Sequence, residues 1–553
     1  MKRWRVNFVF IIVILFGAAI ISRLVYIQII QHDLYRALAN GQQKNYQLIK
    51  GERGEIFFSG GEILATNVKG KYLFVSPEKI KEKEKTAQIL SEIFGLDKEL
   101  IFAKLKKNSL FEQIKSNLTE EENRALGEIN LPGVYLGETF FREYPQGLMA
   151  SQTVGFIGGE EKGQYGIEGF YDDILQGKEK IQNLIYGLTS DTNGADIFLT
   201  INYELQFKAE KLLEKTKEEF NVEEGQIVIV DPKSGAILAL ANFPNFDPNY
   251  YSKVDDFHIF QNNVLQKLFE PGSVFKSITM AAALDQDKIT PKTTYIDEGN
   301  LKIGGYTIYN YNKRIWGERT MTEVLEKSIN TGAIFAERQI GHKIFLEYLE
   351  KFGFFEPTEI DLQGEIFSEN KEFKKSYEIN FATASFGQGI EMTPIQLVQA
   401  FNVIANNGKL VRPYIVEKVI ENGSPSQVLT DKTWKGKQVI SSKTSSQLTA
   451  MMISVVENGS AKNTKIPGYY IAGKTGTSQI PWTVLGVNKK GYSDKTWQSF
   501  IGFFPAFNPK FLILVKLDNP ETKTSEYSAV PIFKEMAKYI IDYYEIPPDY
   551  EPI

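Results

Sequence analysis

An apolar run near the N-terminus constrains this 553-residue chain more than any other feature. A basic segment, Lys2 to Arg5, precedes it, and residues 6–22 carry no charge. That length is at the short end of what spans a bilayer, and Arg23 can extend its charge to the interface. Because basic flanks stay in the cytoplasm, we expect the rest of the chain to lie outside the membrane.

A cleaved signal peptide is the main alternative, since Ala18 and Ala19 offer small residues for a cleavage site. The continuation Arg23-Leu24-Val25-Tyr26 is poor for a cleavage region, which favours an uncleaved anchor. A second alternative is that the apolar run forms a buried core helix. Its N-terminal position and its flanking charge argue against this alternative. No later stretch is apolar enough to span a membrane.

Charge and composition exclude several function classes. The 63 Lys and Arg residues nearly balance the 68 Asp and Glu residues, which argues against a nucleic-acid partner. The chain has no cysteine, so thiolate catalysis, disulfides and cysteine-based metal sites are absent. Its three histidines, His32, His258 and His342, fit no metal-binding spacing. No metal or organic cofactor is implied, and a serine nucleophile here would need a base other than histidine.

The length allows about three or four domains at roughly 100–200 residues each. The Gly-rich, polar stretch Tyr186 to Asp196 is the best boundary. We expect a cytoplasmic stub and transmembrane anchor over residues 1–30, an N-terminal pedestal over 31–195, and the main domain over 196–553.

Strand patterns flank a long, mostly helical middle in the main domain, which predicts an α+β fold with an antiparallel sheet covered by helices. The predicted strands and the final amphipathic helix are Gln226–Asp231, Ala236–Ala241, Phe500–Phe504, Phe511–Leu517 and Tyr527–Tyr544. In the pedestal, Lys79 to Glu99 has a charged, helical pattern.

The pattern Ser-x-x-Lys places a serine and a lysine base on one face of a helix, and the chain has three matches. Ser76 to Lys79 has the features of a helix N-cap followed by proline, and Ser368 to Lys371 lies in a polar run predicted as a loop. Ser273-x-x-Lys276 differs, because a Glu-Pro-Gly turn precedes it and an apolar helix follows. This serine would lie near the positive, buried start of that helix.

Two further patterns follow Ser273-x-x-Lys276 along the chain. Ser328-Ile-Asn330 ends a helix that begins near Thr322, and Lys474-Thr475-Gly476-Thr477 follows a strand-like run. A glycine in a strand lets a second backbone approach closely, so a peptide substrate could lie along that edge. Taken alone, each of these two patterns is better explained as an ordinary polar helix end or an ordinary strand glycine. The order of the three patterns along the chain makes a chance occurrence a minor possibility.

The three patterns resemble the motif set of β-lactamases and penicillin-binding proteins. From the anchor to Pro548, the chain resembles the class B penicillin-binding proteins, which are monofunctional peptidoglycan D,D-transpeptidases. The resemblance implies a transpeptidase domain of the serine β-lactamase type after a pedestal of the dimerisation type. Ser385-Phe-Gly-Gln, Gln498-Ser-Phe-Ile-Gly502 and Ile546-Pro-Pro548 are similar to the division or sporulation type. Further similar segments are Arg53–Ile56, Leu64–Asn67, Arg142–Pro145, Gly155–Gly158, Gly166–Glu168, Asp231–Gly235, Phe386–Gly389 and Thr393–Gln396.

The resemblance implies a role for each motif residue in acyl transfer. Ser273 would be the nucleophile that forms an acyl-enzyme with the penultimate D-alanine of a stem peptide. Lys276 would be the general base, with a pKa that burial and the nearby cation of Lys474 could both lower. Ser328 would pass the proton to the leaving D-alanine, and Asn330 would fix Lys276 and hold the donor's backbone amide.

The same resemblance implies that the Lys-Thr-Gly segment binds the substrate. Lys474 and the hydroxyls of Thr475 and Thr477, beside Gly476, would bind the terminal carboxylate. Backbone N–H groups of Ser273 and Thr477 would form the oxyanion hole. The pattern of residues 482–497 predicts an exposed, charged loop that either shapes acceptor access or, as loop lengths favour, is a plain hairpin extension.

Several rival functions share parts of this pattern. A D,D-carboxypeptidase differs only in accepting water, a β-lactamase needs neither anchor nor pedestal, and an elongation-type transpeptidase shares the whole pattern. A class A synthase would need a glycan-polymerising domain that the pedestal is too short to hold. A scaffold or antibiotic sensor would need none of the catalytic residues.

The resemblance implies stem peptides and lipid-linked nascent glycan as substrates, and β-lactams as ligands. The pedestal would contact a membrane glycan polymerase and division proteins, although its charged helices fit a passive spacer equally well. The expected location is the cell membrane, with a single pass, a cytoplasmic N-terminus and an extracytoplasmic catalytic domain. Septal cell-wall synthesis is the expected role.

Overall fold

The computed structural model describes residues 3–32, 35, 48–127, 129, 131–159, 161–177, 179–181, 193–375, 377–421, 424–427 and 436–551. The chain forms two compact units and passes between them more than once. The first unit is Met1–Arg53, Thr66–Glu143 and Gln176–Gly194; the second is Gly54–Ala65, Tyr144–Leu175 and Ala195–Ile553. Most of the predicted linker from Tyr186 to Asp196 lies outside the described residues. The boundary between 195 and 196 stays a prediction.

The first unit begins with the predicted apolar helix. Helix α1 spans Arg3–Val25 and continues into one π-helical turn, η1, at Tyr26–Ile30. Its apolar side chains are exposed, Phe16 to 68%. A helix in a soluble core would bury such side chains, whereas lipid would surround them. Among the described helices, only that over Phe8–Ile29 is long and apolar enough to cross a bilayer.

A long antiparallel ribbon forms the centre of the first unit. Strand β3 (Ile63–Val75) pairs with β5 (Val134–Glu143) from Thr66 opposite Glu143 to Val75 opposite Val134. Three helices and β4 enclose a small core around Leu73, Leu90 and Leu105. The other elements of this unit are β1 (Leu48–Lys50), α3 (Lys83–Phe94), α4 (Lys98–Leu105), β4 (Glu112–Lys115), α5 (Glu120–Gly127) and β8 (Glu179–Ile181).

The helix N-cap predicted at Ser76 is wrong. Ser76 begins a turn, which the Lys79 N–H closes by donating to the Ser76 carbonyl oxygen (2.9 Å). Helix α3 begins only at Lys83. Because Ile80 is buried in the small core, the chain must turn inward before the helix can start. The predicted helical stretch also divides, since Gly95 ends α3 in the left-handed conformation and Asp97 caps α4.

A five-stranded antiparallel sheet organises the second unit, in the order β11-β10-β22-β21-β20. Every residue of β22 is buried, as expected for a sheet covered on both faces. The four strands predicted as Gln226–Asp231, Ala236–Ala241, Phe500–Phe504 and Phe511–Leu517 occur as β10 (Glu224–Val230), β11 (Ile237–Phe243), β21 (Tyr492–Phe504) and β22 (Phe511–Asp518). The fifth strand of the sheet is β20 (Ala472–Pro481).

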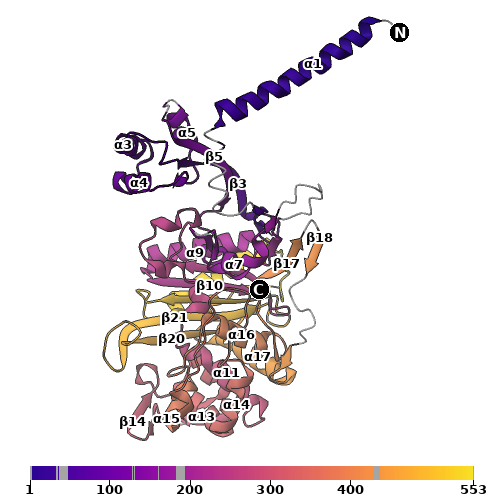
Figure 1. The fold of residues 1–553 in the computed structure, drawn as a ribbon. Helices are drawn as coiled ribbons and strands as arrows, with labels where there is room; N and C mark the ends of the chain where they lie inside the picture. The colour runs from indigo at the N-terminus through magenta and orange to yellow at the C-terminus, as the bar shows by residue number, and fades with distance from the viewer. Residues whose placement is uncertain are drawn as a thin grey trace. The chain divides into compact units, whose positions relative to one another are not determined.

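Helices cover both faces of this sheet (Figure 1). Helix α9 (Tyr203–Phe220) lies on one side, where Lys208 pairs with Glu535 of α18 (Ala529–Tyr543) at 2.9 Å. On the other side lie α11 (Lys276–Asp285), α16 (Pro394–Ala405) and α17 (Ser442–Asn458). The predicted α+β fold, an antiparallel sheet covered by helices, is therefore confirmed.

A second sheet of this unit joins segments far apart in sequence. Strand β17 pairs antiparallel with β18 and β9, and β9 pairs in parallel with β2. The other elements are β2 (Ile56–Phe57), α6 (Ser151–Val154), β6 (Phe156–Ile157), β7 (Gly163–Gln164), α7 (Gly166–Phe170), α8 (Asp172–Leu175), β9 (Asp196–Leu199), η2 (Pro248–Lys253), η3 (Phe257–Phe260), α10 (Asn263–Gln266), η4 (Gly272–Phe275), β12 (Thr294–Asp297), β13 (Asn300–Ile303), β14 (Tyr306–Tyr309), η5 (Tyr311–Lys313), β15 (Gly317–Thr320), α12 (Met321–Lys327), α13 (Asn330–Ile340), α14 (His342–Lys351), η6 (Phe373–Lys375), α15 (Glu378–Ala384), β16 (Lys409–Leu410), β17 (Val416–Glu421), β18 (Ser424–Gln427), β19 (Lys437–Gln438), η7 (Lys462–Thr464) and η8 (Ser525–Tyr527).

Candidate active site

Ser273 lies where a tight turn enters the buried helix α11. Gly272 has φ +59°, and the 3₁₀ turn η4 carries Ser273 directly into α11. Val274, Phe275 and neighbouring side chains of α11 are fully buried. Their burial anchors the turn, so the start of the helix holds Ser273 in place.

Lys276 stands one helical turn after Ser273 and points back toward it. Its Nζ donates to Ser273 Oγ (3.0 Å), Ser328 Oγ (3.1 Å) and the Ser328 carbonyl oxygen (2.7 Å). The side chain is fully buried. Burial, and then the nearby Lys474, lower the pKa of Lys276 well below its ordinary value. A neutral amine within reach of a hydroxyl can act as a general base.

Ser328 bridges two lysine amines. It caps the C-terminus of α12 in the left-handed conformation, with φ 55°, which is uncommon for a residue other than glycine. Its Oγ accepts from Lys276 Nζ and from Lys474 Nζ (3.2 Å). The helix predicted to end at this motif is present, and the capping box of Thr320 and Glu323 starts it. Unusual backbone geometry of this kind occurs often at functional sites.

Strand β20 carries the Lys-Thr-Gly segment past the nucleophile. Burial lowers the pKa of Lys474 to about 7, and its Nζ contacts Thr475 Oγ1 at 3.3 Å. A Cβ on Gly476 would lie 2.8 Å from the Pro271 carbonyl oxygen, so only glycine permits this approach. The Ser525 N–H donates to Thr477 Oγ1 (3.2 Å), which fixes that hydroxyl oxygen.

Asn330 is not hydrogen-bonded to either lysine in the part of the chain that the structure describes. It begins α13, and its Nδ2 donates to the Tyr309 carbonyl oxygen (3.0 Å) while its backbone N–H donates to Asn310 Oδ1 (3.0 Å). Among the hydrogen bonds of the described residues, none joins Asn330 to Lys276. The assignment of Asn330 to the site stays a prediction.

The structure thus brings Ser273, Lys276, Ser328 and Lys474 into one hydrogen-bonded group. Three neighbours of the motif residues were not predicted: Ser460, whose Oγ is 3.1 Å from Thr475 Oγ1, together with Ser525 and Asn310. Nothing in the sequence marks them. The Ser368 pattern lies in a loop, where Lys371 pairs with Glu369 (3.1 Å).

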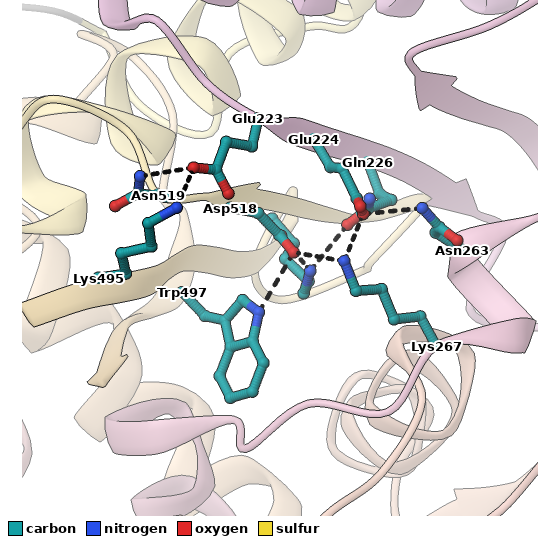
Figure 2. Close-up of polar contacts among 10 residues, drawn as sticks. Glu223, Glu224, Gln226, Asn263, Lys267, Lys495, Trp497, Asp518 and Asn519 are labelled. Carbon is teal, nitrogen blue, oxygen red and sulfur yellow. Dashed lines mark hydrogen bonds and ion pairs between the residues drawn. The ribbon is translucent and has the colours of Figure 1, made fainter. Parts of the chain in front are cut away.

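An ionic cluster consists of Glu224 on β10, Lys516 and Asp518 on β22, and Lys267, which precedes Ser273 in the sequence. Figure 2 shows Lys267 between Glu224 and Asp518. Lys267 Nζ donates to Glu224 Oε2 (2.6 Å) and to Asp518 Oδ2 (3.2 Å). Lys516 also donates to Asp518, and both side chains are nearly inaccessible. Ion pairs of this cluster bind Lys267 to β10 and β22. They therefore fix the chain that leads to Ser273 against the sheet.

Known protein families match both parts of the chain. A family model described as the penicillin binding protein transpeptidase domain matches residues 225–538, more than half of the chain. A second, described as the penicillin-binding protein dimerisation domain, matches residues 48–187.

Individual proteins match over most of their length. The chain is 31% identical to "Stage V sporulation protein D" of Bacillus subtilis, over 92% of this chain and 81% of that protein. It is 30% identical to "Probable peptidoglycan D,D-transpeptidase PbpC" of Pseudomonas aeruginosa, over 99% of this chain and 97% of that protein. The crystal structure of penicillin binding protein 3 from Mycobacterium tuberculosis with aztreonam shares the fold, with a TM-score of 0.70, 23% identity, and coverage of 92% of this chain and 99% of that one.

Proposed function

This chain belongs to the class B penicillin-binding proteins, and we propose that it is a serine D,D-transpeptidase that cross-links the stem peptides of peptidoglycan. The observation that carries the proposal is the contact between Lys276 Nζ and Ser273 Oγ, 3.0 Å apart, with the lysine fully buried and the serine partly exposed. A relative named as a peptidoglycan D,D-transpeptidase supports the same substrate class.

Acylation starts with neutral Lys276, which takes the proton of Ser273 as its oxygen attacks the carbonyl carbon of the penultimate D-alanine. The tetrahedral intermediate collapses as the bond to the terminal D-alanine breaks. Ser328, whose Oγ accepts from both lysines, relays the proton to the leaving amine. An amine of a second stem peptide then attacks the ester, which releases Ser273 and forms the cross-link.

The terminal carboxylate of the donor peptide binds to Lys474, Thr475 and Thr477 on β20, which is an edge strand of the five-stranded sheet. Backbone N–H groups of Ser273 and Thr477 receive the oxyanion, a contribution commonly worth about 3–4 kcal/mol. Asn330 holds the donor's backbone amide. A β-lactam presents the same carboxylate and reactive carbonyl, so it acylates Ser273 by the same route.

The N-terminal apolar helix α1 is a membrane anchor. We propose a cytoplasmic N-terminus and an extracytoplasmic catalytic domain, because the basic residues lie on the N-terminal side of the helix. The domains proposed are residues 1–30 for the anchor, 31–195 for the pedestal and 196–553 for the transpeptidase. A septal role, with a glycan polymerase and division proteins as partners, is part of the same proposal; a relative named for sporulation fits the division or sporulation type expected from the sequence.

A synthetic donor peptide ending in D-alanyl-D-alanine tests this function when it is offered with and without an amine acceptor. The purified protein should release D-alanine and form the cross-linked product only with the acceptor. Ser273→Ala should abolish both, while Ser368→Ala, in a matched Ser-x-x-Lys pattern, should change neither. Hydrolysis that ignores the acceptor would indicate a carboxypeptidase, and no release of D-alanine would contradict the proposal.

A further inference from the structure

Glu270 is a buried carboxylate that the mechanism above does not use. It lies three positions before Ser273 in the sequence and is 5% exposed. The Tyr492 hydroxyl donates to the carboxylate, with both oxygens at 3.1 Å, and the Gly389 N–H also donates to it. Burial raises the pKa of Glu270 to about 7, against the lowering effect of these two donors. Because a buried carboxylate is costly even when it is hydrogen-bonded, its presence here calls for an explanation.

The backbone of Glu270 is bound to β20. Ser478 Oγ donates to the Glu270 carbonyl oxygen at 2.6 Å, and Ser478 directly follows Thr477. Phe269 forms an antiparallel bridge with Met392, with hydrogen bonds of 2.9 and 3.1 Å. The nucleophile turn, defined here as residues 269–273, is therefore attached both to β20 and to the loop 387–392.

Three backbone segments touch at this turn because three glycines lack side chains. A Cβ on Gly476 would lie 2.8 Å from the Pro271 carbonyl oxygen, and one on Gly272 would lie 3.0 Å from that of Thr477. A Cβ on Gly387 would lie 2.2 Å from the Gly272 carbonyl oxygen. The two N–H groups of the proposed oxyanion hole come from two of these segments, so their spacing depends on how the segments are held together.

We propose that Glu270 is a positioning residue: hydrogen bonds from Tyr492 and Gly389 to its carboxylate hold the nucleophile turn against β20, so that the N–H groups of Ser273 and Thr477 point at one oxygen. Tyr492 is the first residue of β21, at the end of the hairpin loop 482–491. Residues 492–497, predicted as part of a loop, belong to β21, so the contact with the nucleophile turn comes from this strand. The inference rests on the proposed function, in which Ser273 is acylated.

Stopped-flow acylation of the full chain by a fluorescent penicillin tests the proposal, because saturation separates the acylation rate constant from the dissociation constant of the initial complex. Glu270→Ala should lower the rate constant roughly 10- to 100-fold, as expected for a misplaced reacting group. The dissociation constant should stay within about two-fold, because no hydrogen bond of the described residues joins Glu270 to Lys474, Thr475 or Thr477. Glu270→Gln keeps an oxygen that can accept from the Tyr492 hydroxyl, so its acylation rate constant should fall less than that of Glu270→Ala.

Tyr492, which donates to the Glu270 carboxylate, provides an independent variant. Tyr492→Phe removes one hydroxyl and should lower the rate constant without changing the dissociation constant. The double variant Glu270→Ala, Tyr492→Phe should be no slower than Glu270→Ala alone, because the two residues act through one contact. If Glu270→Ala fails to fold, Glu270→Gln and Tyr492→Phe still decide the question.

Glu210→Gln is the matched control. Glu210 lies in α9, across the sheet from α11. Burial raises its pKa to about 7, and its carboxylate accepts from the Ala150 N–H (2.7 Å). It should acylate like the parent. Parent rate constants in the Glu270 and Tyr492 variants would overturn the inference, as would a dissociation constant that weakens as much as the rate falls. No acylation of the parent would overturn the proposed function and this inference with it.

Discussion

Lys276 and Lys474 are two buried amines that share one serine hydroxyl. Each Nζ lies within 3.2 Å of Ser328 Oγ. Two like charges this close disfavour each other, and burial disfavours both. The arrangement lets one amine stay charged for carboxylate binding while the other stays neutral for proton transfer.

The pH dependence of acylation follows from this pair. The second-order rate constant should fall in acid, as Lys276 gains a proton, and fall again above about pH 7, as Lys474 loses its charge. Lys474→Met removes the cation that lowers the pKa of Lys276, so that pKa should rise and the acid limb should move to higher pH. Lys443→Met, at an exposed lysine, is the control. An acid limb that stays in place in Lys474→Met would contradict this assignment.

Ser328 combines a hydroxyl with a left-handed backbone, and two substitutions separate these properties. Ser328→Ala and Ser328→Gly should both lower acylation by a penicillin roughly 100-fold or more, because both lack the proton relay. Glycine adopts φ 55° without strain, whereas alanine does not. In a denaturant titration, the free energy of unfolding of Ser328→Gly should therefore equal that of Ser328→Ala or be higher by up to about 1 kcal/mol. Recovery of acylation in Ser328→Gly would show that geometry, not the hydroxyl, matters.

At the scale of elements, the ionic cluster joins three parts of the fold: β10, β22 and the segment leading to Ser273. Burial alone would raise the pKa of Asp518, but Lys516 and Lys267 hold it below its usual value. The Trp497 Nε1–H also donates to it (3.2 Å). A partly buried network of this kind is worth most when every member keeps its partner.

Asp518→Ala should therefore destabilise the protein by about 3–5 kcal/mol, because it leaves Lys516 buried without its carboxylate. A carboxylate with a lowered folded-state pKa stabilises the fold above its unfolded pKa and stops doing so as pH falls through the folded value. The difference in the free energy of unfolding between parent and variant should therefore shrink below about pH 4. Denaturant titrations at several pH values check this, with Asp287→Ala of the exposed Lys443 pair as a control that should change little. Equal stability of Asp518→Ala and parent at pH 7 would contradict it.

The sequence predicts elements well where the pattern is local. The apolar run Phe511–Leu517 is β22, and the amphipathic pattern from Tyr527 is α18. It fails at Ser76, because burial of Ile80 by residues distant in sequence decides where the helix begins. It gives no sign of the pairing of β2 with β9, where Ile56 lies opposite Ile197.

The same division holds for the candidate site. The resemblance of three short patterns to a known motif set predicts Ser273, Lys276, Ser328 and Lys474, and the order of these patterns along the chain makes coincidence a minor possibility. Contacts such as Ser525 with Thr477, or Tyr492 with Glu270, join residues with no shared local pattern. Only the three-dimensional fold brings them together.

For the whole molecule, the proposed role of α1 as an uncleaved membrane anchor can be tested against a cleaved signal peptide. Membranes from cells that produce the full chain should hold a protein whose N-terminal peptide includes residues before Ala18, as mass spectrometry of a digest would detect. A variant that lacks residues 1–32 should leave the membrane fraction. A mature chain that starts just after Ala19 would instead establish a cleaved signal peptide.

The central claim is that Ser273 is the acylated nucleophile and Lys276 its base. Intact-mass spectrometry of the protein after incubation with a penicillin tests it most directly, beside Ser273→Ala and Lys276→Arg. The parent should gain the mass of one penicillin and keep it, Ser273→Ala should gain nothing, and Lys276→Arg should react at least about 100-fold more slowly because a guanidinium stays charged. An equal adduct on Ser273→Ala, or penicillin consumed with no adduct on the parent, would contradict the account.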